Sequence, residues 1–420
     1  GGEAVLARRK ARSSAERDAP MQPKVGVAYT LALPGEGDRH KFGVNALALT
    51  RNTAPQASWA GGISLFTAGR DARVRRWDVT ALESGGGFSP RRPARKLPLV
   101  ATYSDHSDWV NAVVVAPAHG LLVSASSDHT LKLWPLDEPD APEARATVNT
   151  HTDYVKALAY APSSGVLASA SLDKMIHLFK MDTLARFASS GGTSGGVEFS
   201  ADGNVRDGPT VLAGHRDSVY CLAMNTAGTL IASGSVEPEV RLWDARTARK
   251  HAKLAGHTDV VRALLLDADG RTAVSASSDR TVRVWDVGSQ RCIHTLRVHR
   301  DAAWALDVDA GWATLYSGGR DGSIVATSLS TFRSARVAHE AAPIVRLASS
   351  VGGTHLWSAT TRSDVRCWSL DGVGAALQAG ASHAAALSDA EETLTPRSAG
   401  AHGRGGGGGG GGFLSQQYAQ

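Results

Sequence analysis

A unit of roughly 40 residues that returns along the chain is the feature that most constrains its fold. The clearest copy runs from His257 to Asp286 and reads HTDVVRALLLDADGRTAVSASSDRTVRVWD. Apolar and polar residues alternate through VVRALLLD, TAVSASS and TVRVWD, and turn residues separate these runs, which is typical of short antiparallel strands. A fourth strand follows in RCIHTLRVH. One such small sheet cannot bury both of its faces, so neighbouring copies must stack against it.

Each copy also carries polar residues that an ordinary strand does not need. In the clearest copy they are His257 at the opening, Ser275 and Ser277 in the second strand, Asp279 in the turn and Trp285 in the third strand. This unit resembles the repeat of WD-repeat proteins, and the resemblance implies a buried hydrogen-bonded network among these residue types. A Ser-His-Asp catalytic triad is the alternative. One active site does not need the same residues in most repeats, whereas one fold does.

Seven units follow one another along the chain. Their opening residues are His40, His106, His151, His215, His257, His299 and, in the seventh, about His339. Their turn positions are Asp71, Asp128, Asp173, Glu237, Asp279, Asp321 and Arg362. The third unit has Phe179 and the sixth has Thr327 in place of the tryptophan. We predict the complete network in the second and fifth units, from His106, Asp128, Trp134, His257, Asp279 and Trp285.

The repeats predict an all-β fold, a WD-repeat β-propeller of four-stranded blades with seven units visible. We place the propeller at residues 23–371, between a disordered basic tail at 1–22 and a low-complexity Gly/Ala-rich tail at 372–420. The alternating segment from Lys24 to Leu31 should add a strand to the last blade and thereby lock the ring.

Composition narrows the class of protein. With 42% hydrophobic residues and a net charge of +5, the chain reads as a globular protein, and no stretch is long and apolar enough to predict a membrane partner. Cys221, Cys292 and Cys367 lack the spacing of metal ligands, so we expect free thiols in a reducing compartment, in the nucleus and cytoplasm. We expect no metal, no cofactor and no enzymatic activity, because no nucleophile and base stand apart from the repeat pattern.

The repeat register predicts which side chains reach one common face. The fifth residue after each opening residue should project toward it: Asn45, Asn111, Lys156, Tyr220, Arg262, Trp304 and Ile344. The residue before each turn position should lie on the same face: Arg70, Ser127, Leu172, Val236, Ser278 and Arg320. Tyr220, Arg262, Trp304 and Arg320 therefore fall together over consecutive blades. Because Tyr, Trp and Arg dominate binding hot spots, we predict a partner-binding site here. The alternative is that Trp304 only packs under a loop.

Several strings are more distinctive than the generic repeat, among them HTDYVKALAYA, QRCIHTLRVH and YSGGRDGSI. From about Lys24 to Leu370 the chain is similar to the WD-repeat activators of ubiquitin-specific proteases, the family of WD repeat-containing protein forty-eight. The resemblance implies a non-catalytic protein that binds the catalytic domain of such a protease and raises its turnover. It also implies contacts from Arg262, Trp304 and Arg320. Relatives have lysine at the first position, so Arg262 keeps the charge but changes the hydrogen-bond geometry.

The chain departs from that family in its repeat number. The resemblance implies eight blades, followed by an ancillary domain and a ubiquitin-like domain, whereas seven units are visible here. Either the early strand closes a seven-bladed ring, or another blade belongs in the gap.

Two other functions remain open. Trp243 to Arg246 spell WDAR, which resembles the motif of propellers that serve as substrate receptors of cullin-RING ubiquitin ligases, so a ligase adaptor is an alternative partner, as is ubiquitin. The basic runs Arg8–Arg17 and Arg91–Lys96 could attract nucleic acid. Solvated tails explain them equally well, and no aromatic residues interleave the charges, so we do not expect nucleic acid as a partner.

Overall fold

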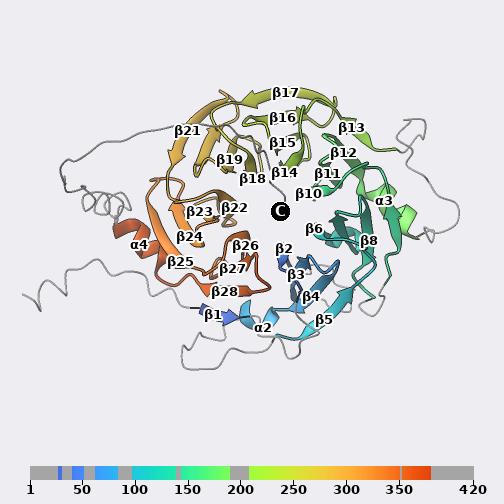
Figure 1. The fold of residues 1–420 in the computed structure, drawn as a ribbon, viewed down its shortest axis with the longest axis horizontal. Coiled ribbons are helices and arrows are strands. Elements are labelled where there is room, and N and C mark those ends of the chain that lie inside the picture. Colours follow the sequence, from blue (N-terminus) through green and yellow to red (C-terminus); the bar gives the residue numbers. More distant parts are fainter. Residues whose placement is uncertain are drawn as a thin grey trace, which may run out of the picture. The chain divides into compact units, whose positions relative to one another are not determined.

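Four short strands in antiparallel order make up each of seven sheets, and the sheets stand in a ring (Figure 1). The computed structural model describes residues 27–30, 40–51, 62–83, 97–138, 143–189, 208–350 and 352–379, all within the first of two units, Gly1–Ser382. The predicted all-β propeller with seven four-stranded blades is confirmed. Successive side chains of a strand point to opposite faces of its sheet, so each blade presents one set of side chains to the preceding blade and the other set to the following blade.

The blades are numbered here in chain order, and each is given from its inner to its outer strand. Blades 1 and 2 are β2 Val44–Arg51, β3 Ile63–Gly69, β4 Val74–Asp78 and β5 Leu99–Tyr103, then β6 Val110–Ala116, β7 Leu121–Ser126, β8 Leu131–Pro135 and β9 Ala146–Val148. Blades 3 and 4 are β10 Val155–Ala161, β11 Val166–Ser171, β12 Ile176–Lys180 and β13 Thr210–Leu212, then β14 Val219–Met224, β15 Leu230–Ser235, β16 Val240–Asp244 and β17 Arg249–Leu254.

The remaining blades follow the same order. Blades 5 and 6 are β18 Val261–Leu266, β19 Thr272–Ser277, β20 Val282–Asp286 and β21 Arg291–Leu296, then β22 Ala303–Val308, β23 Thr314–Gly319, β24 Ser323–Ser328 and β25 Ser334–His339. Blade 7 is β26 Ile344–Ser349, β27 His355–Thr360, β28 Val365–Ser369 and β1 Val27–Thr30. The short helical segments are α2 Thr80–Glu83, η1 Pro117–His119, α3 Met181–Ser189 and α4 Val373–Ala379.

The last blade takes its outer strand from the beginning of the chain. Strand β1 pairs antiparallel with β28, with Val27 opposite Trp368 and Thr30 opposite Arg366. This confirms the predicted early strand for Val27–Thr30, while the rest of Lys24–Leu31 lies outside the described residues. Blades 7 and 1 also share a buried cluster that includes Trp357 and Trp77. Separating these two blades would expose that cluster to water, which opposes opening of the ring.

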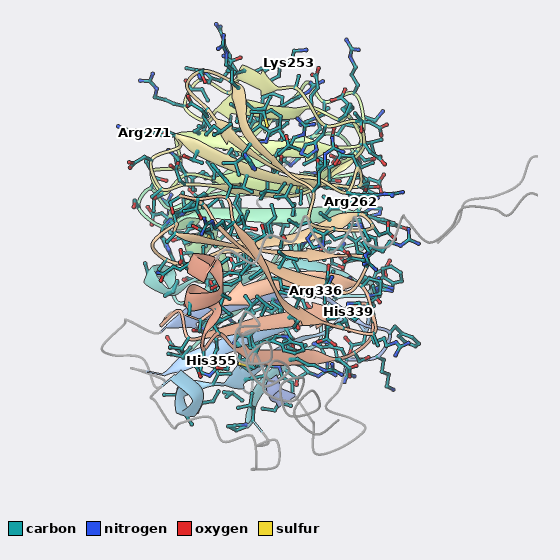
Figure 2. All side chains as sticks on the ribbon, turned by 90° about the vertical axis from the view of Figure 1, so that its left-hand side faces the viewer. Lys253, Arg262, Arg271, Arg336, His339 and His355 are labelled. Atoms are coloured by element: carbon teal, nitrogen blue, oxygen red, sulfur yellow. The ribbon has the colours of Figure 1, made fainter. Side chains whose placement is uncertain are left out.

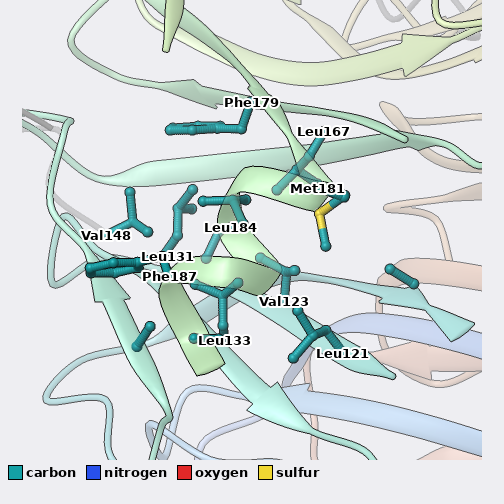
Figure 3. Packing of buried hydrophobic residues seen from close by; sticks show 14 of the residues in the cluster. Leu121, Val123, Leu131, Leu133, Val148, Leu167, Phe179, Met181, Leu184 and Phe187 are labelled. Carbon is teal, nitrogen blue, oxygen red and sulfur yellow. The ribbon is translucent and has the colours of Figure 1, made fainter. Parts of the chain in front are cut away.

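Helix α3 fills a gap between blades 2 and 3 (Figure 3). Its buried residues Met181, Leu184 and Phe187 recur every third position, which gives the short helix one apolar face. They pack against a cluster that includes Leu121 of blade 2 and Leu167 of blade 3. The sequence analysis did not predict this helix, because it lies between two repeat units and belongs to neither pattern.

Helix α4 covers the outside of blade 6. Val373, Ala376 and Leu377 are buried in one cluster with Ile324 and Val337 of that blade. The predicted low-complexity tail at 372–420 is therefore wrong for Val373–Ala379, whose apolar residues pack against the propeller. The predicted tail at 1–22 and residues 380–420 lie outside the described residues. No helix of the described residues is long and apolar enough to cross a membrane.

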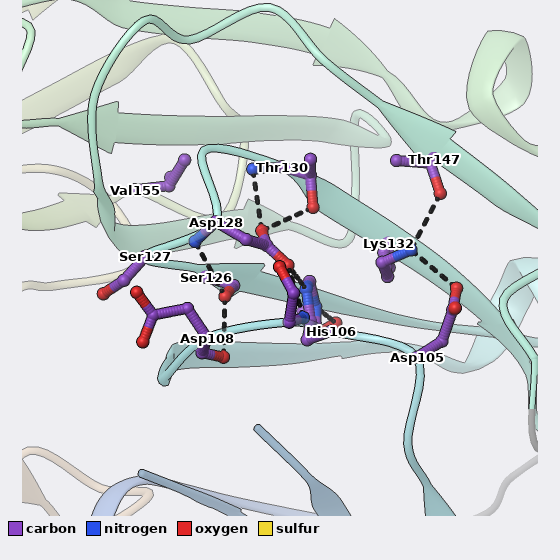
Figure 4. Close-up of polar contacts among 12 residues, drawn as sticks. Asp105, His106, Asp108, Ser126, Ser127, Asp128, Thr130, Lys132, Thr147 and Val155 are labelled. Carbon is purple, nitrogen blue, oxygen red and sulfur yellow. Dashed lines mark hydrogen bonds and ion pairs between the residues drawn. The ribbon is translucent and has the colours of Figure 1, made fainter. Parts of the chain in front are cut away.

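A series of hydrogen bonds in blade 2 links strands β8 and β7 to the loop before β6 and to the turn at Asp128; Figure 4 shows the surroundings of His106 and Asp128. The Trp134 indole N–H donates to Ser124 Oγ at 2.8 Å, and Ser124 Oγ lies 2.7 Å from His106 Nε2. His106 Nδ1 lies 2.7 Å from a carboxylate oxygen of Asp128. These partners fit one tautomer: the serine hydroxyl donates to Nε2, and Nδ1–H donates to the aspartate. The Trp134 N–H, the Ser124 hydroxyl and both nitrogens of His106 then each have a hydrogen-bond partner.

Blade 5 repeats this chain of hydrogen bonds. Trp285 Nε1 lies 2.7 Å from Ser275 Oγ, and His257 lies 2.7 Å from both Ser275 Oγ and Asp279. Burial lowers the pKa of His257, which keeps the imidazole neutral. Burial by itself would raise the pKa of Asp279, but hydrogen bonds from Thr281 and His257 lower it overall. A neutral imidazole therefore donates to an ionised carboxylate at neutral pH.

Replacing Asp279 with alanine should lower the free energy of unfolding by about 1 to 3 kcal/mol, because the buried His257 N–H loses its acceptor. Asp269→Ala is the matched control, since Asp269 is exposed in the loop between β18 and β19 of the same blade. The control should change stability by less than about 0.5 kcal/mol. Urea unfolding of the two variants measures the difference, and equal stabilities would contradict a buried network.

His177 in blade 3 predicts a loss of stability in mild acid. Its ring stacks on that of His151 with 4.0 Å between centroids, and burial first, then the charge of His151, lower the pKa of His177 from 6.5 to about 4. As pH falls from about 6.5 to about 4, the unfolded chain takes up this proton and the folded protein does not. Above about pH 6.5 this proton has no effect on the free energy of unfolding, and below it the free energy of unfolding decreases progressively as the pH falls to about 4. His177→Phe should reduce the slope of unfolding free energy against pH there by up to about 1.4 kcal/mol per pH unit. Identical slopes for variant and wild type would show that the prediction is wrong.

Candidate functional site

A β-bulge in each inner strand aims one side chain at the face formed by the loops before the inner strands, which we call the upper face. In all seven blades the pairing of the first two strands shifts by one residue, as between Val261 and Ala263. A bulge leaves one residue out of the ladder and redirects its side chain. The residues left out are Asn45, Asn111, Lys156, Tyr220, Arg262, Trp304 and Val345. With Arg346 they line a cavity of about 220 Å³ at the mouth of the central channel.

The sequence prediction for this ring is wrong at blade 7. Ile344 was expected on the upper face, but it is 0% exposed in the core, and Val345 lines the mouth instead. The prediction counted from His339, whereas Glu340 is the buried opening residue of this blade. Trp368 donates to Ser358, which places both in the network positions counted from Glu340. A shift of one residue moves a strand side chain to the opposite face.

The four predicted partner-binding residues form two stacked pairs over blades 4 to 6, which we call the Trp304 sector. The guanidinium of Arg262 lies 4.8 Å from the centre of the Tyr220 ring, and its Nε donates to Ser278 Oγ at 3.2 Å. Arg320 lies 6.0 Å from the Trp304 ring centre and 3.7 Å from a carboxylate oxygen of Asp301. Tyr220, Arg262 and Trp304 line the same cavity. Each arginine is thus held on an aromatic face with its charge toward solvent or the cavity.

Trp304 carries an unused hydrogen-bond donor. The residue is half-buried, and its indole N–H is buried without a hydrogen-bond partner among the residues that the structure describes. The loop-packing alternative accounts for the partial burial of the ring, but it leaves this donor unsatisfied. A buried donor without a partner costs free energy, so an acceptor brought by a ligand would be favoured at this position.

A second group of aromatic residues on the upper face escaped the sequence analysis. Trp109 and Tyr154 are 44% and 41% exposed, and each is the third residue after an opening histidine. Arg70 lies 4.8 Å from the Trp109 ring centre, and Lys156 lies 5.4 Å from that of Tyr154. We call these four residues, over blades 1 to 3, the Trp109 sector. Counting the third residue after each opening residue, as well as the fifth, would have found this sector. An aromatic residue in a polar loop is itself a sign of a binding surface.

Cations dominate the mouth of the channel. Lys156, Arg262 and Arg346 line it, and no carboxylate does so among the described residues. Burial is the main reason that the pKa of Lys156 is lowered, and the charge of Arg70 acts in the same direction. The amide of Asn111 is already committed, since it donates to Val155 O at 2.9 Å and to Ser127 Oγ at 3.0 Å. The mouth therefore suits an acidic or acceptor-rich group of a partner.

The alternative sites of the sequence analysis are less well supported by geometry. In the WDAR motif, Trp243 is buried and donates to Ser233 at 2.7 Å, and Asp244 accepts from the Arg246 N–H at 2.8 Å within a turn. Both residues thus have structural roles, and Arg246 is exposed. The basic runs Arg8–Arg17 and Arg91–Lys96 lie outside the described residues. Within the described ranges, no group of His, Cys, Asp and Glu could hold a metal ion.

One comparison with known families bears on this architecture. The family model "WD domain, G-beta repeat" matches residues 97–135, 143–180, 209–244 and 249–286. Each match begins at the outer strand of one blade and ends at the third strand of the next, as from β5 to β8. The sequence repeat is therefore offset from the blade by one strand, which explains why β1 completes blade 7. The fold is a WD40 β-propeller, typically a non-catalytic scaffold for interactions between proteins.

The corrected register of blade 7 can be tested by two neighbouring truncations. Ile344→Ala should lower the free energy of unfolding by about 2 to 5 kcal/mol, because it leaves a cavity in the core. Val345→Ala removes a half-buried side chain at the channel mouth and should cost less than about 1 kcal/mol. Denaturant unfolding distinguishes them. A larger loss of stability for Val345→Ala than for Ile344→Ala would favour the register counted from His339, in which Ile344 faces the channel mouth.

Proposed function

We propose that this protein binds the catalytic domain of a ubiquitin-specific protease through the Trp304 sector and activates it without taking part in the chemistry. The single observation that carries the proposal is the juxtaposition of Arg262, Trp304 and Arg320 on one face. The family resemblance implies these three residues as the protease contact. In support, Arg262 and Trp304 line one cavity from adjacent blades, and Arg320 lies over the Trp304 ring. We further propose that this interaction takes place in the nucleus and the cytoplasm.

The physical properties of the sector support a binding centre of this kind. Trp304 offers a flat ring and an unsatisfied N–H, so it can bury apolar area and donate one hydrogen bond to the partner. Arg262 is already fixed by Ser278 and Tyr220, which reduces the side-chain entropy lost on binding. Arg320 is the most exposed of the three, with 59% of its side chain accessible, and can reach a carboxylate at the edge of the interface.

Activation follows from selective binding. If the propeller binds the competent conformation of the protease more tightly than the idle one, saturating binding multiplies the ratio of competent to idle protease by the ratio of the two affinities. No catalytic group needs to cross the interface. The propeller alone should therefore not cleave a ubiquitin conjugate.

Trp304→Ala should weaken binding to the protease catalytic domain at least about 30-fold, equivalent to about 2 kcal/mol, because the central ring and its donor are lost. Arg320→Asp should be comparably harmful, since it reverses the charge offered to an acidic partner. Calorimetric titration gives the affinities, and turnover of a fluorogenic ubiquitin substrate by the protease gives the activation.

The matched control is Trp109→Ala, the same truncation on the same face but in the other sector. It should bind and activate like the wild type. Asn111 is a poorer control, because its amide is held by Val155 and Ser127 within the fold. Wild-type affinity for Trp304→Ala would contradict the proposal, and a selective loss for Trp109→Ala would move the site to blades 1 to 3. Binding of a cullin-RING adaptor that depends on Arg246, with no binding of the protease, would favour the ligase alternative instead.

A further inference from the structure

One arginine interrupts the narrow, apolar lining of the central channel. The residue that follows each bulge is small in six blades and arginine in the seventh: Ala46, Ala112, Ala157, Cys221, Ala263, Ala305 and Arg346. Small side chains suit this ring because the inner strands converge at the axis. Below the mouth, five of the small residues and Arg346 border a second cavity of about 180 Å³. Apart from Arg262 and Arg346, the lining of this cavity is apolar, with residues such as Leu158 and Leu264.

The charge of Arg346 is not compensated by the described residues. Its side chain borders both the channel cavity and the mouth, and none of the described residues lining either of them carries a carboxylate. Within the part of the chain that the structure describes, its guanidinium donates one hydrogen bond, to the carbonyl of Val345 at 3.4 Å. Burial lowers the pKa of Arg346 and raises the pKa of the neighbouring Cys221 thiol to about 12, so this thiol stays neutral. Arg346 is half-buried, and a partly desolvated cation without a counter-charge is costly, which indicates that an anion belongs beside it.

Three further hydrogen-bond donors line the cavity at the mouth beside Arg346. Arg262 borders both cavities, Lys156 lines the mouth, and Trp304, which also lines the mouth, has an indole N–H without a partner among the described residues. A guanidinium presents a planar fork of N–H groups that matches the two oxygens of a carboxylate or phosphate. Each cavity is several times the roughly 30 Å³ that one water molecule occupies in the liquid, so an oxyanion can enter with part of its hydration.

We propose that the central channel is an anion-binding site in which Arg346, assisted by Arg262 and Lys156, holds one oxyanion group, a phosphate or a carboxylate. The ligand enters from the upper face, where the mouth opens. The site lies beside the Trp304 sector but is centred on a residue that the proposed protease contact does not use. It therefore does not depend on the proposed function.

The test uses the protein alone, at low ionic strength, with inorganic phosphate and acetate as two separate probes. Isothermal titration should show saturable binding of at least one probe at one site, and the midpoint of thermal unfolding should rise with its concentration. At about 100 times Kd, the ligand shifts the folding equilibrium roughly 100-fold toward the folded state. Saturation by phosphate identifies a phosphate site, and saturation by acetate alone identifies a carboxylate site.

Arg346→Met removes the charge but keeps a long side chain in the apolar ring. It should abolish saturable binding, and without ligand it should be at least as stable as the wild type, because a half-buried, uncompensated cation is gone. Arg271→Met is the matched control: Arg271 is exposed, and Figure 2 shows it on the opposite side of the blade from Arg262. The control should bind as the wild type does. A general salt effect would raise the midpoint equally in all three proteins.

Two results would overturn the proposal: no saturable binding of either probe to the wild type, or unchanged binding to Arg346→Met. Arg346→Lys covers the case in which the methionine variant does not fold. Lysine keeps the charge but lacks the planar fork, so its affinity for the probe should fall about tenfold or more. Affinity equal to that of the wild type would show that Arg346 does not hold the anion.

Discussion

No blade of this propeller can bury its own apolar faces, and the rest of the structure follows from that constraint. Each four-stranded sheet has two faces to cover, and stacking in a ring covers both of them in every blade. The buried clusters accordingly join neighbouring blades, as where Trp134 of blade 2 packs with Phe66 of blade 1. A ring needs a first and a last member in contact. The one-strand offset between repeat and blade provides this, because β1 joins the two ends of the propeller through the sheet of blade 7.

Convergence of the inner strands at the axis then determines the chemistry of the upper face. The residue after the bulge is small in six of the seven blades, where the strands approach closely, and the bulge itself frees one neighbouring residue from the sheet. Each blade thus contributes one variable side chain at the mouth of the channel without disturbing its core. A rigid framework carries the variable residues, and the hydrogen-bonded chain from Trp285 to Asp279 fixes the loop beside them. Arg346 is the exception at this position, because the other six blades have alanine or cysteine there.

The repeat made the blades, their network and most of the upper face predictable from the sequence. Strand alternation depends on local residues, so it survives in a single sequence, and the positions of Arg262 and Trp304 at the mouth followed from counting alone. Counting failed where the repeat itself is degraded. In blade 7 glutamate replaces the opening histidine, and the nearby His339 shifted the register by one residue. Helices α3 and α4 escaped because they cover blades from outside the repeat. Arg346 escaped because its significance depends on what surrounds it in space.

The proposed function requires that a protease docks over blades 4 to 6 of the upper face. Hydrogen–deuterium exchange of the propeller, with and without the catalytic domain of a ubiquitin-specific protease, tests this claim by locating the amides that become protected. Slower exchange should appear in the upper-face loops that precede β14, β18 and β22, around Ser218, Val260 and Ala302, whereas the lower loops should be unchanged. Protection confined to the loops beside Trp109 and Tyr154, or to the lower face near Arg271, would contradict it.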